Sequence, residues 1–278
     1  MKTVRYWLFA AICTLFAAQS FAADNAKQEV DVKVIETKAY YKANIERPLY
    51  STCTLLYCDV TRVANYDLTD FRRALCQEFG LKTLFTDPGN AATWNTWFLD
   101  SYSDDFTQVP KAGETVDYDS WYKNHSGSDD YECGAPYENV SLTYCGYYSS
   151  LAIIDMEYSI YVTSSNCLSA GNSYSSRHVY FDFKNSRVLT LNDILRPGWK
   201  AALTKAVRER AESSTDCLMV DVNNIELSDN WVVYPGALTF VYPKYAIACG
   251  ADGNVEIEVP LSAFEGFLKD GYSALFAK

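Results

Sequence analysis

The clearest alternation of apolar and polar residues lies toward the C-terminal end of the chain. Two apolar runs, Trp231–Tyr234 and Ala237–Tyr242, are separated by Pro235-Gly236. Because Pro-Gly favours a turn between runs of β-branched and aromatic residues, this pattern predicts a β-hairpin. Farther on, residues 255–259 alternate valine or isoleucine with glutamate, which predicts a strand with one buried and one solvent-facing side.

A short amphipathic helix is predicted directly after this strand. Pro260 is favourable at the first position of a helix, and the apolar residues Leu261, Phe264 and Leu268 recur at helical spacing. The helix is therefore expected to pack against the hairpin and the strand that precede it.

Three further segments show the helical period. The first can be capped by Asp67 and ends at Gly80, and its apolar positions are Leu68, Phe71, Leu75 and Phe79. The second follows Pro88-Gly89, and its aromatic positions are Trp94, Phe98, Tyr102 and Phe106. The third follows Pro197, and its apolar positions are Trp199, Leu203, Ala206 and Val207. Their apolar sides are expected to pack in the core.

Five other segments have the composition or the alternation of strands: residues 30–34, 52–60, 140–148, 151–162 and 177–183. The segment 151–162 is nearly continuous in β-branched and aromatic residues, which indicates a central strand. Together these elements predict an α+β protein with an antiparallel or mixed sheet and packed amphipathic helices.

The first residues have the composition of a secretory signal. Lys2 and Arg5 form a positive start, the apolar run 6–18 is short for a membrane span, and Ser20-Phe21-Ala22 provides a small-x-small cleavage site. Residues 1–22 are therefore predicted to be removed, and the mature protein is expected in the periplasm or outside the cell. No membrane span is expected after this cleavage.

The charge balance restricts the expected partners. The chain has 24 Lys and Arg against 35 Asp and Glu, a formal net charge of −11. Cleavage of the signal would remove two positive charges and no negative one. Because such a surface repels phosphate backbones, nucleic acid is not expected as a partner, whereas a basic protein would be attracted.

The cysteines indicate an oxidising compartment. Eight of the nine follow the predicted signal, and an even number in an exported chain favours disulfides. The candidates are Cys53, Cys58, Cys76, Cys133, Cys145, Cys167, Cys217 and Cys249. Their connectivity is left open by the sequence. A metal cluster is the alternative, but no C-x-x-C pair supports one, so no metal site is predicted.

The segment between Asp100 and Glu132 is acidic and aromatic, with nine carboxylates and two lysines. Such a loop can attract a cationic protein and then bind it through Tyr and Trp side chains. The residues predicted to contact a partner are Tyr118, Trp121, Asp129, Asp130 and Glu132. The alternatives are a solvated acidic loop that keeps the protein soluble, and a calcium site, for which no D-x-D-x-D-G loop is present.

Motifs for catalysis are scarce in the sequence. The chain has two histidines, His125 and His178, and lacks G-x-S-x-G, H-E-x-x-H and a Gly-rich phosphate loop. Serine, zinc and nucleotide chemistries are therefore disfavoured, no cofactor is expected, and His178 is predicted to have a structural role in its strand. A glycoside hydrolase needs only two carboxylates, so that class stays open.

Several C-terminal motifs resemble the C-terminal domain of RsiV-like proteins, the bacterial lysozyme-binding anti-sigma factors. These motifs are the Tyr-x-Ile-Ala segment 245–248 that ends at Gly250, the strand and Pro-led helix after it, and the segment Arg187–Leu195 after Phe181-Asp182-Phe183. The resemblance covers about residues 137–270. It implies a domain at residues 137–278, preceded at 23–136 by an α+β companion domain as in some peptidoglycan deacetylases.

Two departures from that family limit what the resemblance implies. Many members have a Gly-Gly-Ala-His turn where this chain has residues 168–172 without a histidine. The signalling members also need a cytoplasmic sigma-binding segment and a membrane crossing, and this chain shows neither, so it is not expected to be an anti-sigma factor.

The sequence therefore predicts an exported, non-catalytic binding or sensing protein of the cell envelope. A basic, lysozyme-like protein is the partner that the resemblance and the acidic charge imply. The alternatives are a protein that binds cell-wall glycan through exposed aromatic residues, and a carbohydrate-active hydrolase that uses a carboxylate pair.

Overall fold

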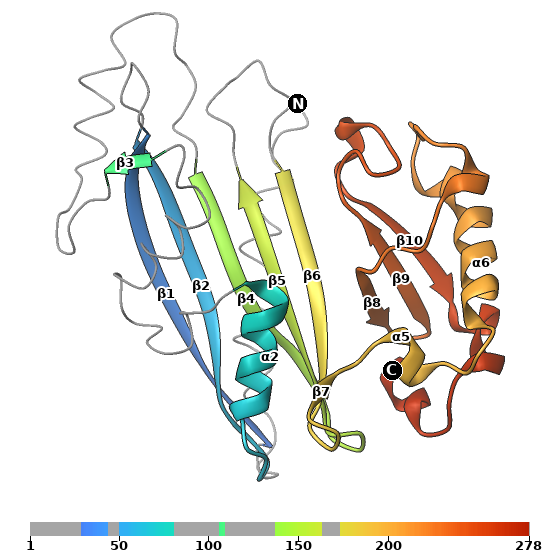
Figure 1. The fold of residues 1–278 in the computed structure, drawn as a ribbon, viewed down its shortest axis with the longest axis horizontal. Coiled ribbons are helices and arrows are strands. Elements are labelled where there is room, and N and C mark those ends of the chain that lie inside the picture. The colour runs from blue at the N-terminus through green and yellow to red at the C-terminus, as the bar shows by residue number, and fades with distance from the viewer. Residues whose placement is uncertain (1–28, 44–49, 81–105, 109–136, 163–172, 278) are drawn as a thin grey trace, which may run out of the picture.

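The computed structural model describes residues 29–43, 50–80, 106–108, 137–162 and 173–277 (Figure 1). In these ranges the chain forms a seven-stranded mixed sheet, a three-stranded antiparallel sheet and a few helices. The predicted α+β class is confirmed.

The large sheet has the strand order β3-β1-β2-β4-β5-β6-β7. Its strands are β1 (Val30–Ala43), β2 (Tyr50–Val63), β3 (Phe106–Gln108), β4 (Tyr137–Tyr148), β5 (Ile153–Val162), β6 (Ser173–Asp182) and β7 (Arg187–Val188). All neighbours are antiparallel except β2 and β4, which run parallel and join the two halves of the chain. Strand β5 lies between β4 and β6, so its predicted central place is confirmed.

One face of the large sheet is covered by helix α2 (Thr69–Phe79), and we call it the helix face (Figure 1). The helix contributes the buried residues Phe71, Leu75 and Phe79 to a core with apolar residues of β4, β5 and β6. The rings of Phe71 and Phe181 meet edge to face with centroids 5.5 Å apart. The predicted apolar stripe of this helix is thus confirmed.

The ends of α2 lie close to the predicted positions. Leu68 occupies the cap position, but the carboxylate of Asp67 accepts a hydrogen bond from the N–H of Thr69 at 2.9 Å and satisfies a donor of the first turn. Gly80 ends the helix with φ of 65°, a left-handed conformation that glycine adopts without steric cost.

The small sheet has the order β10-β9-β8 and packs against helix α6 (Trp199–Ser214). Its strands are β8 (Trp231–Tyr234), β9 (Ala237–Tyr242) and β10 (Val255–Pro260). The hairpin of β8 and β9 and the one-sided burial of β10 are as predicted. Figure 1 shows α6 on the side of this sheet that is away from the large sheet.

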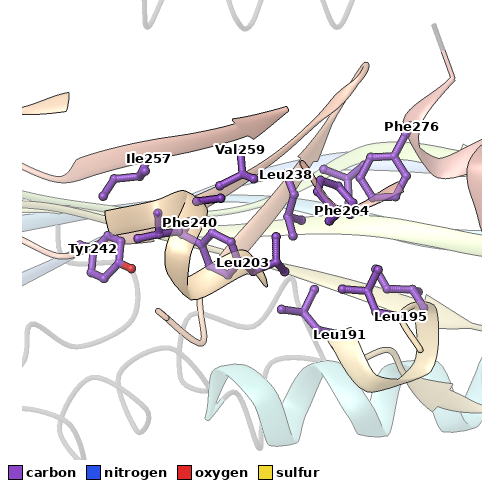
Figure 2. Close-up of a cluster of buried hydrophobic side chains, with 14 of the residues drawn as sticks. Leu191, Leu195, Leu203, Leu238, Phe240, Tyr242, Ile257, Val259, Phe264 and Phe276 are labelled. Carbon is purple, nitrogen blue, oxygen red and sulfur yellow. The ribbon is translucent and has the colours of Figure 1, made fainter. Parts of the chain in front are cut away.

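A second hydrophobic core lies between α6 and the small sheet. Figure 2 shows Leu203 of α6 among Leu238 and Phe240 of β9 and Val259 of β10. Short helices close its edges: α5 (Leu191–Ile194), η1 (Val222–Asn224), η2 (Gly250–Asp252), η3 (Leu261–Ala263), η4 (Glu265–Phe267) and η5 (Tyr272–Phe276).

Two helix predictions differ from the structure. After Pro260 the chain forms the two 3-10 turns η3 and η4 instead of one α-helix, although Phe264 is buried as predicted. Phe106, predicted on a helix, lies in β3 and pairs with Ala43 of β1. Pairing with a strand distant in sequence thus outweighed the local aromatic spacing. The rest of that predicted helix lies outside the described residues.

Five of the candidate cysteines are unbonded in the structure. Cys58, Cys76, Cys145, Cys217 and Cys249 are free thiols in the structure, so the predicted disulfides are not confirmed. The predicted boundary between residues 136 and 137 falls between β3 and β4, and strands from both sides of it share the large sheet. Among the described residues, no helix is both long enough and apolar enough to cross a membrane.

Candidate functional site

The candidate site lies on the face of the large sheet opposite α2. Thr143 of β4 pairs with Glu157 of β5, and Glu157 pairs with His178 of β6. Directly opposite residues share a face, and residues two apart along a strand do as well, so Asp155 lies on this face too. We call this face, with Cys145, Asp155, Glu157 and His178, the polar face.

A β-bulge in β4 sets the position of Cys145. Tyr144 pairs with Met156, but the next pair joins Gly146 to Asp155, so Cys145 is the extra residue of β4. Because Tyr144 packs into the core of the helix face, the following side chain points to the polar face. The bulge therefore places a thiol beside Asp155.

Three metal-ligating side chains meet at this point. The sulfur of Cys145, a carboxylate oxygen of Asp155 and a ring nitrogen of His178 all lie within 4.8 Å of one another. Nδ1 of His178 is 2.9 Å from Oδ1 of Asp155, which is hydrogen-bond distance. Asp155 is only 5% exposed, and the side chain of His178 is 12% exposed, so the pair is largely withdrawn from water.

Carboxylates dominate the electrostatics of the polar face. Burial lowers the pKa of His178, but the hydrogen bond with Asp155 and the charges of Glu157 and Glu256 raise it, and the net pKa lies above its ordinary value. Desolvation by surrounding protein atoms, together with Asp155 and Glu157, raises the pKa of the Cys145 thiol well above its usual range. The site therefore favours a cation.

The small sheet is fixed to the large sheet beside this cluster. The hydroxyl of Tyr180 accepts a hydrogen bond from the N–H of Val233 at 2.9 Å, and the ring of Tyr180 stacks on Trp231 with centroids 4.8 Å apart. The side-chain amide of Asn230 donates to the carbonyl of Ser176 at 2.5 Å. Strands β6 and β8 are thus held together by polar and aromatic contacts.

This contact brings acidic and aromatic residues of both sheets together. Tyr174 donates a hydrogen bond to Glu157 at 3.2 Å. Burial, followed by the charges of Glu256, Glu157 and Asp155, raises the pKa of Tyr234 on β8, which indicates that these groups lie near it. We call Glu157, Tyr174, Tyr234 and Glu256 the acidic tyrosine cluster. Tyr174 and Tyr234 are 45% and 44% exposed, so a partner can reach them.

The chemistry of the three converging side chains favours cation binding over nucleophilic catalysis. A cysteine nucleophile must be a thiolate, and a positive neighbour normally lowers its pKa. Here Asp155 and Glu157 act in the opposite direction on Cys145. Sulfur, nitrogen and carboxylate oxygen are, however, the ligand atoms that zinc sites use.

A separate open groove of about 900 Å³ lies between α6 and η1. Its lining contains charges of both signs, including Lys205, Arg208 and Glu209, and no cysteine or histidine. It contains none of the residues that the sequence singles out for binding.

The residues predicted to contact a partner cannot be placed on this site. Tyr118, Trp121, Asp129, Asp130 and Glu132 lie outside the described residues, as do Cys133 and Cys167. Among the other cysteine candidates, Cys53 and Cys58 lie in β2, Cys76 in α2 and Cys145 in β4. The structure brings Cys217 and Cys249 face to face.

Sequence reasoning missed Cys145, Asp155 and His178 as a group. The sequence predicts a structural role for His178, and its hydrogen bond with Asp155 agrees with that role. The same ring nitrogen can also bind a metal ion. A usable signal was present: Asp155 and Glu157 interrupt an apolar strand at alternate positions, which marks a polar face. The distance from each of them to Cys145 depends on the bulge, which the sequence does not show.

Residues 192–262 match a protein family described as "Protein of unknown function (DUF3298)". A crystal structure of a DUF3298 member from Bacteroides fragilis NCTC 9343 is similar to the chain with a TM-score of 0.56 and 17% identity, over 89% of this chain and 98% of that one. A DUF3298 protein from Pseudomonas aeruginosa PAO1 is similar with a TM-score of 0.54 and 14% identity, over 90% and 97%. No curated protein matches the chain. The chain therefore contains a DUF3298 domain and shares its overall fold with these two family members.

Proposed function

We propose that this protein is an exported, non-catalytic binding protein of the cell envelope and that its partner is a basic protein. The observation that supports this most directly is the acidic tyrosine cluster. It combines the carboxylates Glu157 and Glu256 with two tyrosines that are nearly half exposed.

The two kinds of side chain in the cluster have different roles in binding. The carboxylates would attract a basic partner from a distance and speed association, an effect that salt screens. Tyrosines contribute buried contact area at low entropic cost and can bind Arg or Lys over the ring, so they would slow dissociation. The net charge of −11 acts in the same direction as the local carboxylates.

The resemblance to RsiV-like proteins makes a lysozyme-like protein the first basic partner to test. In this proposal the acidic aromatic segment with Tyr118, Trp121, Asp129, Asp130 and Glu132 also contacts the partner. Export by cleavage after Ala22 would bring the mature protein to the compartment where such a partner is met.

Surface plasmon resonance of the mature chain against lysozyme and against soluble peptidoglycan fragments tests this function. The double variant Glu157→Gln/Glu256→Gln should associate with lysozyme more slowly at about 0.1 M salt, where the Debye length is about 10 Å, and the difference should fade at about 1 M. Tyr234→Ala should mainly speed dissociation. The matched control is Glu209→Gln/Glu212→Gln on exposed positions of α6, which makes the same change in net charge away from the cluster.

Each outcome of this experiment has one meaning. An equal effect of the two double variants would show that only net charge matters and would contradict a role for the cluster. Binding of peptidoglycan fragments without salt dependence, and no binding of lysozyme, would replace the proposal with glycan recognition.

A further inference from the structure

We propose that Cys145, Asp155 and His178 form a binding site for a divalent zinc ion. This site goes beyond the proposed function, and its test needs no protein partner. The three ligand atoms come from three adjacent strands, lie within 4.8 Å of one another, and represent sulfur, oxygen and nitrogen.

The backbone fixes these ligands before any ion binds. Asp155 and His178 are held by the antiparallel ladders of β5 with β4 and β6, and the bulge at Cys145 aims the thiol at them. Bulges commonly redirect a side chain in this manner beside functional sites. A site built on central strands of a sheet loses little conformational entropy when the ion binds.

A bound cation would compensate the negative charge of the carboxylates on the polar face. Asp155 is a nearly buried carboxylate, and buried charges in proteins are paired or coordinate metals. Asp155 shares a hydrogen bond with His178, while Glu157 and Glu256 add negative charge nearby. Zinc would bind between Asp155 and His178 in place of the proton that now joins them, so that proton and the thiol proton of Cys145 would both be released to solvent.

Three protein ligands leave a fourth position of a tetrahedral zinc site open. Structural zinc sites have four protein ligands, whereas sites with three keep a water or an exogenous group in the fourth position. Glu157, directly opposite His178 on the neighbouring strand, is a candidate for that position or for contact with the bound water.

Cys58 provides the rival explanation for Cys145. It lies on β2, beside β4, and the two thiols are close enough for their charges to interact. A disulfide between them would remove the sulfur ligand. The proposal therefore requires that Cys145 is a thiol in the exported protein, and this can be measured by alkylation and peptide mass spectrometry.

Metal titration of the purified mature chain tests the site. Zinc should bind with a stoichiometry of one by elemental analysis after dialysis, and cobalt in its place should give the ultraviolet charge-transfer absorption of a thiolate ligand. Cys145→Ser, Asp155→Asn and His178→Gln should each weaken zinc binding by about tenfold or more. The matched controls are Cys76→Ser, His125→Gln and Cys58→Ser, which should bind zinc like the wild type.

The results that would overturn the zinc site are specific. They are the absence of zinc binding by a folded protein with a free Cys145, an unchanged cobalt spectrum in Cys145→Ser, or a Cys58–Cys145 disulfide in the protein as isolated. Circular dichroism of each variant excludes loss of fold as the cause of lost binding.

A second, independent observation concerns Cys217 and Cys249, and from it we infer that these two residues form a disulfide. An antiparallel bridge joins Leu218 to Ala248, and the N–H of Cys249 donates to the carbonyl of Cys217 at 2.9 Å. Cys217 and Cys249 are therefore directly opposite each other. The neighbouring thiol of Cys249 also raises the pKa of the Cys217 thiol, as expected for two thiols on opposite residues.

The geometry of such a pair suits a disulfide. Opposite residues that share a backbone hydrogen bond in an antiparallel ladder have Cα atoms about 5.5 Å apart, which is near the preferred separation in disulfides. Cys217 is exposed, so an oxidant can reach it. In thiol–disulfide exchange, a reactive disulfide of an envelope oxidoreductase would take up two electrons and two protons and become a dithiol while the Cys217–Cys249 bond forms.

Peptide mapping without reductant tests this bond. The exported protein should yield one cross-linked pair of peptides containing Cys217 and Cys249, and reduction should release both. In Cys217→Ser, Cys249 should become alkylatable while the state of Cys58 and Cys145 stays unchanged. Free Cys217 and Cys249 in the exported protein, or a bond from either to another cysteine, would overturn the inference.

Discussion

The two faces of strands β4, β5 and β6 differ although every strand contributes alternate residues to both. On the helix face, Ile154 and Met156 are fully buried against residues of α2. On the polar face, the intervening Asp155 and Glu157 meet His178 and the small sheet. A shift of one residue along the strand thus separates a dry core from a charged site.

This difference shows how one sheet can serve stability and binding at once. Burial of apolar area on the helix face stabilises the sheet by roughly 25 cal/mol per Å². That stability allows the polar face to keep carboxylates close together, which is unfavourable without a ligand. We therefore expect substitutions on the helix face to change stability strongly and those on the polar face to change ligand binding.

The largest stability effect is expected for Phe71→Ala on α2. Phe71 is 1% exposed and contacts Phe181 and Phe183, so its removal leaves a cavity and should lower the free energy of unfolding by about 3–5 kcal/mol. Urea unfolding followed by circular dichroism measures it. Tyr174→Ala, an aromatic truncation on the polar face, should cost less than about 1 kcal/mol. Equal losses would remove the distinction between the faces.

An intermediate effect is expected for Tyr180→Phe, at the junction of the polar face with the small sheet. The ring can stay stacked on Trp231, but the buried N–H of Val233 loses its acceptor, which should cost about 1–3 kcal/mol. The control is Tyr234→Phe, which removes an exposed hydroxyl and should change stability by no more than about 0.5 kcal/mol. Unfolding of both variants in urea gives the comparison, and a neutral Tyr180→Phe would show that water satisfies the N–H.

The smallest effect is the pH dependence from His178, measured with a chelator present. Among the described residues, the groups that act on or face this ring include Cys145, Asp155, Glu157 and Glu256, and the ring of Tyr180 stacks on it. Because the folded pKa of His178 is raised, its stabilisation is fully present below the unfolded pKa of about 6.5 and is lost as pH rises through the folded pKa.

Thermal unfolding of the wild type and of His178→Gln at several pH values tests this sign. The advantage of the wild type should be constant below pH about 6.5, should shrink as pH rises from there to the folded pKa, and should be absent above the folded pKa. An advantage that grows with rising pH would show that the neutral ring is the form favoured by the fold.

The sequence predicts elements well where the signal is local. Pro235-Gly236 fixes the hairpin of β8 and β9, and the alternation at residues 255–259 gives the burial of β10 because both depend only on neighbours in the chain. The prediction of an α-helix after Pro260 was wrong in the type of helix. Leu261 and Phe264 are three residues apart, and this spacing is compatible with both an α-helix and a 3-10 turn.

The candidate site could not be predicted, because it depends on pairings across the sheet. Cys145 is ten residues from Asp155, and His178 is farther along the chain, so only the registers of β4, β5 and β6 show that they meet. Alternation after Tyr144 puts Cys145 on the polar face, but its position relative to Asp155 depends on the bulge in β4. A search of the sequence for known motifs detects neither the strand registers nor the bulge.

The parallel pairing of β2 with β4 has a consequence for the folding of the newly synthesised chain. The strands on its two sides are far apart in sequence, so the loop between them must close before the large sheet is complete, and such non-local contacts form slowly. Until then the hairpin of β1 and β2 presents an unpaired strand edge. The nascent protein is thus most vulnerable to aggregation between the emergence of Val63 and that of Tyr137, and a chaperone that binds strand edges would act in that interval.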